Sequence, residues 1–289
     1  MARVFSYSEI ESGRVPDQAL FDGVPKSFRI SAGFGVRSEE LVGAMIFGSV
    51  AVGRANRRSD IDVLISMELD DQQCFEAAKR VVEALKKATK GLVPVQHIFR
   101  SSYNLDEGHD EMDRYFGMHL TGPHRIVVGK DPAESMAFQK SPAGKIIDDY
   151  AHEKVRKISN GMSADEEHDQ LRHIQRLLDL PNAVGRKALR AVDEVESTAR
   201  IGDDTANKTA VLNAALELFD EHGIAAFPRM LIELDTLYNH VLDDAVDHHT
   251  SRKSYDKFLA DIASQAPAAV AWLNSVDEEM ALRFGRSEN

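Results

Sequence analysis

The sequence of 289 residues predicts an α+β fold, in which a small mixed sheet with flanking helices is followed by an all-helical part. Short apolar or β-branched runs, which are typical of strands, occur only before residue 130. From about residue 140 onward the apolar residues recur at helical spacing. The stretch GKDPAESMAFQKSP, residues 129–142, has the composition of a connection. We therefore expect two domains, residues 1–139 and 140–289.

Four segments of the N-terminal part are predicted to be strands because they are short and rich in apolar and β-branched residues. They are AMIFGS at 44–49, DIDVLISM at 60–67, LVPVQHIF at 92–99 and HRIVVG at 124–129. An amphipathic helix is predicted at 71–89, and Gly91 follows it as glycine commonly follows a helix end.

The C-terminal part is predicted to contain only helices. Ser141-Pro142 is a typical helix opening, because proline is well tolerated in the first turn. Pro181, Gly202, Gly223 and Pro267 are predicted to separate the later helices. Those helices are expected at 164–179, 182–200, 206–222, 228–246, 252–264 and 267–284.

The charge distribution indicates which classes of partner the protein attracts. The formal net charge is −12, which argues against broad non-specific attraction to nucleic acid, although a local basic groove leaves tRNA open as a partner. Residues 140–289 hold 27 acidic and 18 basic residues, a net charge of −9. This negative field is consistent with solvated helix faces, and also with attraction of a cationic substrate or partner.

Cysteine usage and hydropathy predict the compartment. The single cysteine, Cys74, lies in a helical pattern, so we expect it to be buried, without a disulfide or a zinc site. The N-terminus lacks an apolar segment of signal-peptide length. No run approaches the roughly 20 apolar residues of a membrane span. We therefore expect a cytoplasmic protein without a membrane partner.

The segment FGSVAVGRANRRSDID, residues 47–62, predicts a metal–nucleotide site. Asp60 and Asp62 are two residues apart in a predicted strand, so they project to one face while Ile61 projects to the other. Two adjacent carboxylates repel each other unless a cation lies between them. Mg²⁺ typically binds through one or two carboxylates together with substrate phosphates.

Gly48 and Ser49 supply the phosphate half of the predicted site. Glycine lets the backbone approach a phosphate closely, and the following amides and the serine hydroxyl can donate hydrogen bonds to it. A tight connection between the strands would bring this turn beside Asp60 and Asp62.

The same segment resembles the signature of the nucleotidyltransferase superfamily that includes DNA polymerase β. In that signature a Gly-Ser or Gly-Gly pair is followed, at about this distance, by Asp-x-Asp on the next strand; Gly53 and the tetrapeptide Ser59-Asp60-Ile61-Asp62 strengthen the match. The resemblance covers residues 44–130. It implies transfer of a nucleoside monophosphate from an NTP, with ATP the first choice, by two Mg²⁺ ions on the catalytic carboxylates Asp60 and Asp62. It also implies nucleotide contacts from Gly48, Ser49, Arg58 and Ser59.

The chain departs from the superfamily at the third acid. Many minimal members carry it in the next strand, where this sequence has Gln96 or His97 in PVQHIF. The streptomycin/spectinomycin adenylyltransferases also lack an acid there, and their catalytic glutamate lies in a segment that DRYFGMHL, residues 113–120, resembles. That resemblance implies Asp113 as the general base; Asp113 is equally suited to cap a helix. Rival acids in the same loop are Asp106, Glu107, Asp110 and Glu111.

Several features leave alternatives open. Arg54, Arg57, Arg58 and Lys145 could meet phosphate or lie solvated on the surface. The acceptor hydroxyl could belong to a cationic small molecule such as an aminoglycoside, or to tRNA or a protein, as for nucleotidyltransferase toxins and antitoxins. Gln96 also permits a regulatory module that binds nucleotide without turnover.

Overall fold

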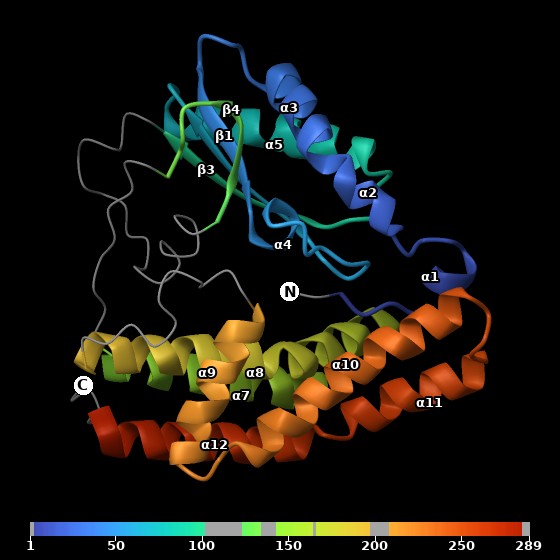
Figure 1. The fold of residues 1–289 in the computed structure, drawn as a ribbon, viewed down its shortest axis with the longest axis vertical. Helices are drawn as coiled ribbons and strands as arrows, with labels where there is room; N and C mark the ends of the chain where they lie inside the picture. Colours follow the sequence, from blue (N-terminus) through green and yellow to red (C-terminus); the bar gives the residue numbers. More distant parts are fainter. Residues whose placement is uncertain (1–2, 102–122, 134–142, 164–165, 197–207, 285–289) are drawn as a thin grey trace. The chain divides into compact units, whose positions relative to one another are not determined.

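The chain forms two compact units in a computed structural model that describes residues 3–101, 123–133, 143–163, 166–196 and 208–284 (Figure 1). One unit is Val15–Lys140, and the other combines Met1–Arg14 with Ser141–Asn289. The sequence places residues 1–14 in the N-terminal domain, whereas in the structure they group with the helical unit. The chain passes from the first unit to the second between residues 140 and 141. This boundary falls within the stretch 129–142, which the sequence predicts to be a connection.

The first unit contains a four-stranded mixed sheet, so the α+β fold class is confirmed. Its strands are β1 (Leu41–Phe47), β2 (Ile61–Met67), β3 (Val95–Ser101) and β4 (Arg125–Gly129). They lie in the order β3-β2-β1-β4. Strand β1 is antiparallel to β2 and β4, and β2 is parallel to β3. The third strand begins three residues later than the sequence predicts.

Helices cover one face of this sheet. They are α2 (Gln18–Asp22), α3 (Val24–Gly35) and α5 (Asp71–Ala88), and α3 packs against α5 (Figure 1). Alternate strand residues such as Ile46, Val63 and Ile65 are buried in this core, because side chains in a strand alternate between faces. The opposite face carries a smaller cluster of Met45, Phe47, Leu64 and Ala133. Asp62 belongs to this second face, since it pairs with Phe47.

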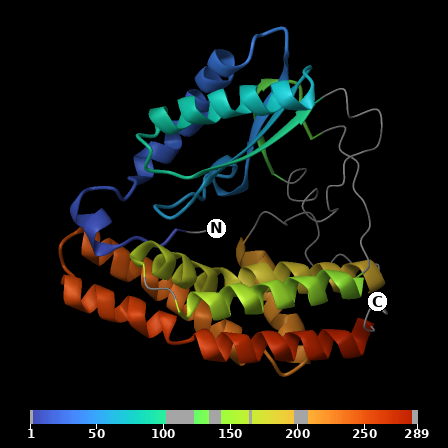
Figure 2. The ribbon, with the colours of Figure 1, turned by 180° about the vertical axis from the view of Figure 1, so that it is seen from behind.

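The second unit is helical, and no helix in its described residues or in the other described parts of the chain is long and apolar enough to cross a membrane. Helix α7 packs against α8 and α12, and α8 also contacts α9, α10 and α11 (Figure 2). The bounds of its helices are α1 (Tyr7–Glu11), α7 (Ala143–Gly161), α8 (Glu167–Glu196), α9 (Lys208–Glu221), α10 (Ala226–Val246), α11 (Arg252–Ala263) and α12 (Ala266–Phe284).

The prediction of a break at Pro181 is wrong. Helix α8 is 30 residues long and contains Pro181 in its interior. Proline lacks an N–H and usually ends or kinks a helix. Leu177, Leu180 and Val184 are buried on both sides of the proline. Burial of this continuous apolar stripe against neighbouring helices outweighs the lost backbone hydrogen bond, so tertiary packing overrides local propensity.

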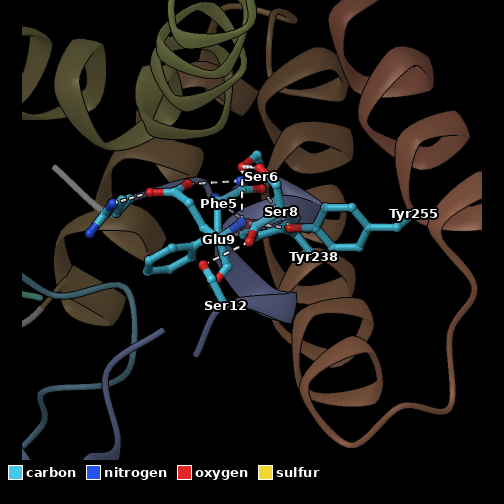
Figure 3. Close-up of polar contacts among 8 residues, drawn as sticks. Phe5, Ser6, Ser8, Glu9, Ser12, Tyr238 and Tyr255 are labelled. Carbon is cyan, nitrogen blue, oxygen red and sulfur yellow. Dashed lines mark hydrogen bonds and ion pairs between the residues drawn. The ribbon is translucent and has the colours of Figure 1, made fainter. Parts of the chain in front are cut away.

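Hydrogen bonds to buried tyrosines join the N-terminal segment to the helical unit. The Phe5 N–H donates to Tyr238 Oη at 2.9 Å, and Tyr255 Oη donates to the Phe5 carbonyl at 2.9 Å (Figure 3). The two tyrosine hydroxyls are 3.0 Å apart. Ser6 then caps α1, with Glu9 completing a capping box. Residues 3–12 are thus an integral part of the helical unit rather than a loose extension.

Candidate active site

A glycine turn lies directly against the carboxylate of Asp62. Strand β1 ends at Phe47, which pairs with Asp62, and Gly48 opens the one-turn helix α4 (Gly48–Ala51). The φ angle of Gly48 is +69°, a conformation that side chains other than glycine rarely adopt. A Cβ atom at Gly48 would lie 2.4 Å from Asp62 Oδ2. Only glycine therefore lets the Gly-Ser turn approach this carboxylate.

Asp62 lies in a partly buried position beside a second carboxylate, Asp60. Asp62 is half-buried in β2, and Asp60 immediately precedes that strand. Burial, and secondly the charge of Asp60, raise the pKa of Asp62 to about 7. A cation between the two carboxylates would reverse both effects, because it favours their ionised forms.

The donor set at this position fits Mg²⁺ bound together with a nucleotide. Among the described residues no three His, Cys, Asp or Glu side chains converge as a metal site. Mg²⁺ does not require such a cage, since one or two carboxylates can hold it while phosphate oxygens and water complete the octahedron. Asp60 and Asp62 would be the protein ligands.

The strand register decides between the two candidates for the position of the third acid. Asp62 pairs with Gln96 in the parallel ladder, and Gln96 is exposed. His97 pairs with Val63, whose side chain belongs to the helix-covered face. Gln96 is therefore the residue beside the carboxylates, and it cannot act as a base at neutral pH.

The loop between Gly48 and Asp60 is organised around Asn56. Ser59 Oγ accepts the Asn56 N–H at 2.9 Å, and Asn56 Oδ1 accepts the Arg58 N–H at 3.0 Å. The Arg58 side chain is only 2% exposed, whereas Arg54 is exposed and Arg57 is half-buried. The Ser59 hydroxyl thus serves the loop itself, and its predicted contact with nucleotide, like that of Arg58, stays a prediction.

Sequence reasoning did not single out Gln18. Its side-chain amide donates to the Ala55 carbonyl at 2.7 Å and so ties α2 to the loop that leads to Asp60. Gln18 and Ala55 are 37 positions apart, so no local sequence pattern indicates this contact. Only the tertiary structure reveals it.

The structure of the sheet unit does not place the remaining candidates. Asp113 and its rivals Asp106, Glu107, Asp110 and Glu111 lie outside the described residues. Lys145 belongs to α7 of the helical unit. The part of the site that the structure does assemble comprises Gly48, Ser49, Asp60, Asp62 and Gln96.

Comparison with known proteins supports the interpretation of this geometry. Residues 35–107 match the family model of the nucleotidyltransferase domain. The match contains β1, the glycine turn, both aspartates and β3. The curated proteins include no match to the chain. Over residues 35–107 the chain is therefore similar to nucleotidyltransferase domains.

Proposed function

We propose that the protein transfers a nucleoside monophosphate from an NTP, with ATP the first choice, to an acceptor hydroxyl and releases pyrophosphate. The observation that carries this proposal is the close approach of Gly48 to Asp62. The turn is suited to phosphate, and burial and the charge of Asp60 raise the pKa of the Asp62 carboxyl beside it, which a bound cation would reverse.

Each residue of the site has a distinct task in this proposal. Gly48 and the amides after it line the phosphates, and the Ser49 hydroxyl donates a hydrogen bond to a phosphate oxygen. Asp60 and Asp62 hold Mg²⁺. Bound Mg²⁺ would neutralise charge on the triphosphate and favour in-line displacement. The acceptor oxygen bonds to the α-phosphorus while the bond to pyrophosphate breaks, and the hydroxyl proton passes to a base.

Asp113 is the residue we propose as that base, because Gln96 cannot take the proton and the local context of Asp113 resembles a known base. We expect Asp113→Asn to lower the transfer rate at least about 10²-fold, since a positioned base contributes typically 10²–10⁴-fold. NTP·Mg²⁺ affinity should stay nearly unchanged. Asparagine remains a good helix cap, so the substitution separates the two roles. Full activity of the variant would leave Asp113 as a cap and direct the test to Asp106, Glu107, Asp110 and Glu111.

The Ser49 hydroxyl should contribute to nucleotide binding. We expect Ser49→Ala to weaken NTP binding by about 1.5–3 kcal/mol, the value of a hydrogen bond to a charged group. Calorimetric titration of NTP in Mg²⁺ measures the effect. Ser38→Ala, at an exposed serine outside the proposed site, is the matched control. Unchanged affinity in Ser49→Ala would show that the phosphates bind elsewhere.

The acceptor we propose is a small cationic molecule with hydroxyl groups, such as an aminoglycoside. The support is the negative charge of residues 140–289, which attracts cations. The same field disfavours tRNA, although tRNA and protein hydroxyls remain alternative acceptors. The exposed Gln96 beside Asp62 favours a second candidate function, a regulator that binds nucleotide without turnover.

Labelled nucleotides test these alternatives together. The protein is incubated with Mg²⁺ and one of the four α-labelled NTPs at a time. Each NTP is tested in separate reactions with aminoglycosides, with total tRNA and with a protein extract as the acceptor. Label transferred to an aminoglycoside with release of pyrophosphate supports the proposal in full. Label on tRNA or protein supports transfer but overturns the proposed acceptor. Nucleotide binding without any transfer would favour the regulator.

A further inference from the structure

Different parts of the structure hold the two proposed metal ligands, Asp60 and Asp62. Asp62 pairs with Phe47 on β1 and with Gln96 on β3, so the sheet fixes its backbone from both sides. In the described sheet, the ladder with β1 ends at Asp62 and the ladder with β3 begins at Ile61. Asp60 therefore lies outside both ladders, and its backbone position depends on the loop that precedes β2.

That loop, residues 54–59, closes into a turn around Asn56. The Asn56 N–H donates to Ser59 Oγ at 2.9 Å, and the Ser59 N–H donates to the Asn56 carbonyl at 2.9 Å. Asn56 Oδ1 accepts the Arg58 N–H at 3.0 Å, which is the pattern of an Asx-turn. The turn ends at Ser59, so its geometry sets the direction in which the chain enters Asp60.

Two hydrogen bonds anchor the start of this loop to helices of the same unit. The Arg54 N–H donates to the Ser49 carbonyl on α4 at 2.9 Å. At the next residue, Gln18 Nε2 on α2 donates to the Ala55 carbonyl at 2.7 Å. Ala55 itself is buried in the helix-covered core. The segment that leads to Asp60 is thus tethered to α2 and α4 and closed by Asn56.

The coordination chemistry of Mg²⁺ makes such positioning important. The ion demands near-ideal octahedral geometry with ligands at about 2.0–2.1 Å, so it tolerates little displacement of a carboxylate. Groups that orient metal ligands without touching the metal typically account for about 10–100-fold in metal affinity. A loop that carries one of two carboxylate ligands is therefore a place where orienting groups have large effects.

We propose that Asn56 and Gln18 are positioning residues, which hold Asp60 where it can bind Mg²⁺ together with Asp62. Asn56 acts through the turn that it closes, and Gln18 acts through the Ala55 carbonyl. Neither side chain is itself a metal ligand. The inference rests on the proposed function, because it assigns a task at the same metal site.

Calorimetric titration of the four NTPs with and without Mg²⁺, on the full chain, tests the inference without an acceptor. Asn56→Ala removes the Oδ1 acceptor, and Gln18→Glu removes the amide donor at nearly constant shape. In each variant the tightening of NTP binding by Mg²⁺ should be at least about fivefold smaller than in the wild type. NTP affinity without Mg²⁺ and the melting temperature should stay close to wild type, because both residues are exposed and the Gly48 turn is unchanged.

A conservative variant separates positioning from a general loosening of the loop. Asn56→Asp retains an oxygen that can accept the Arg58 N–H, so it should recover most of the Mg²⁺ effect that Asn56→Ala loses. Gln72→Glu makes the same exchange as Gln18→Glu at an exposed residue of α5, which follows the far end of β2. This matched control should behave like the wild type.

The outcomes distinguish this inference from the function on which it rests. Absence of a Mg²⁺ effect in the wild type would overturn the proposed metal site, and the inference with it. A wild-type Mg²⁺ effect that survives in Asn56→Ala or in Gln18→Glu would overturn the role of that residue alone. Equal loss of NTP affinity with and without Mg²⁺ would show that the loop only supports the fold, which also overturns the inference. The same result would follow if Asn56→Asp behaved like Asn56→Ala.

Discussion

Asp62→Asn is expected to abolish nucleotide transfer and, in the absence of metal, to stabilise the fold. In the proposed site the substitution removes a metal ligand beside the triphosphate. We therefore expect the rate to fall at least about 10³-fold, within the range that loss of metal-assisted charge stabilisation produces. Asp60→Asn should have a comparable effect on the rate. Pyrophosphate release at saturating Mg²⁺ measures both. Activity of either variant within threefold of wild type would contradict the metal assignment.

The stabilising effect follows from the sign of the pKa shift. The folded protein holds the Asp62 proton more tightly than the unfolded chain, because burial and Asp60 raise the pKa to about 7. Stability from this group is therefore present at low pH and is lost as the pH rises from about 4 to 7. Asp62→Asn avoids that loss. A shift of about three pKa units corresponds to roughly 4 kcal/mol, and solvent screening of the half-buried carboxylate reduces it, so in EDTA at pH 8 the free energy of unfolding of the variant should exceed that of wild type by about 2 kcal/mol.

Denaturant unfolding of wild type and Asp62→Asn across this pH range measures the difference. The two curves should converge near pH 4, where the wild-type carboxyl is also neutral. A variant that is less stable than wild type at pH 8 would show that the charge of Asp62 is already compensated within the protein.

Gly48→Ala should cost both activity and stability. The left-handed backbone costs roughly 1–2 kcal/mol for a residue with a Cβ. In addition, the new methyl group would meet Asp62 Oδ2 at 2.4 Å and displace the carboxylate from its position. We expect a loss of activity of at least about 10²-fold, because a small misplacement of a catalytic group has effects of this size.

Gly53→Ala separates backbone strain from the contact with Asp62. Gly53 also has a φ angle of +69°, but a Cβ there meets nothing within 4 Å. Gly53→Ala should therefore lower the free energy of unfolding through backbone strain alone. Its activity should stay within about threefold of wild type. Similar losses of activity in both variants would mean that strain in the loop, rather than the approach to Asp62, governs activity.

Periodicity predicted most of the sheet unit. The apolar runs before residue 130 correspond to the four strands. Each strand was predictable because its buried residues form a short run rich in apolar and β-branched side chains. Spacing also put Gly48 near the two aspartates. The spacing of residues in the sequence did not predict the register between β2 and β3, which places Gln96, rather than His97, beside Asp62. Register depends on pairing between segments distant in the chain.

Contacts between distant residues account for what the sequence did not predict. Pro181 carries the local signal of a helix end, yet burial on both sides keeps α8 continuous. The hydrogen bonds of Phe5 with Tyr238 and Tyr255, which join the N-terminal segment to the helical unit, likewise have no local signal in the sequence. The role of Asp113 stays a prediction.

We propose that the Gly48 turn and the two carboxylates together bind Mg²⁺ and NTP. The most direct test is calorimetric titration of each NTP with and without Mg²⁺, for wild type and Asp62→Asn, since it requires no knowledge of the acceptor. We predict that Mg²⁺ tightens binding of at least one NTP to the wild type by about tenfold or more, the effect of a fully engaged charge contact. Asp62→Asn should show no such gain. An equal gain in both proteins would contradict the claim.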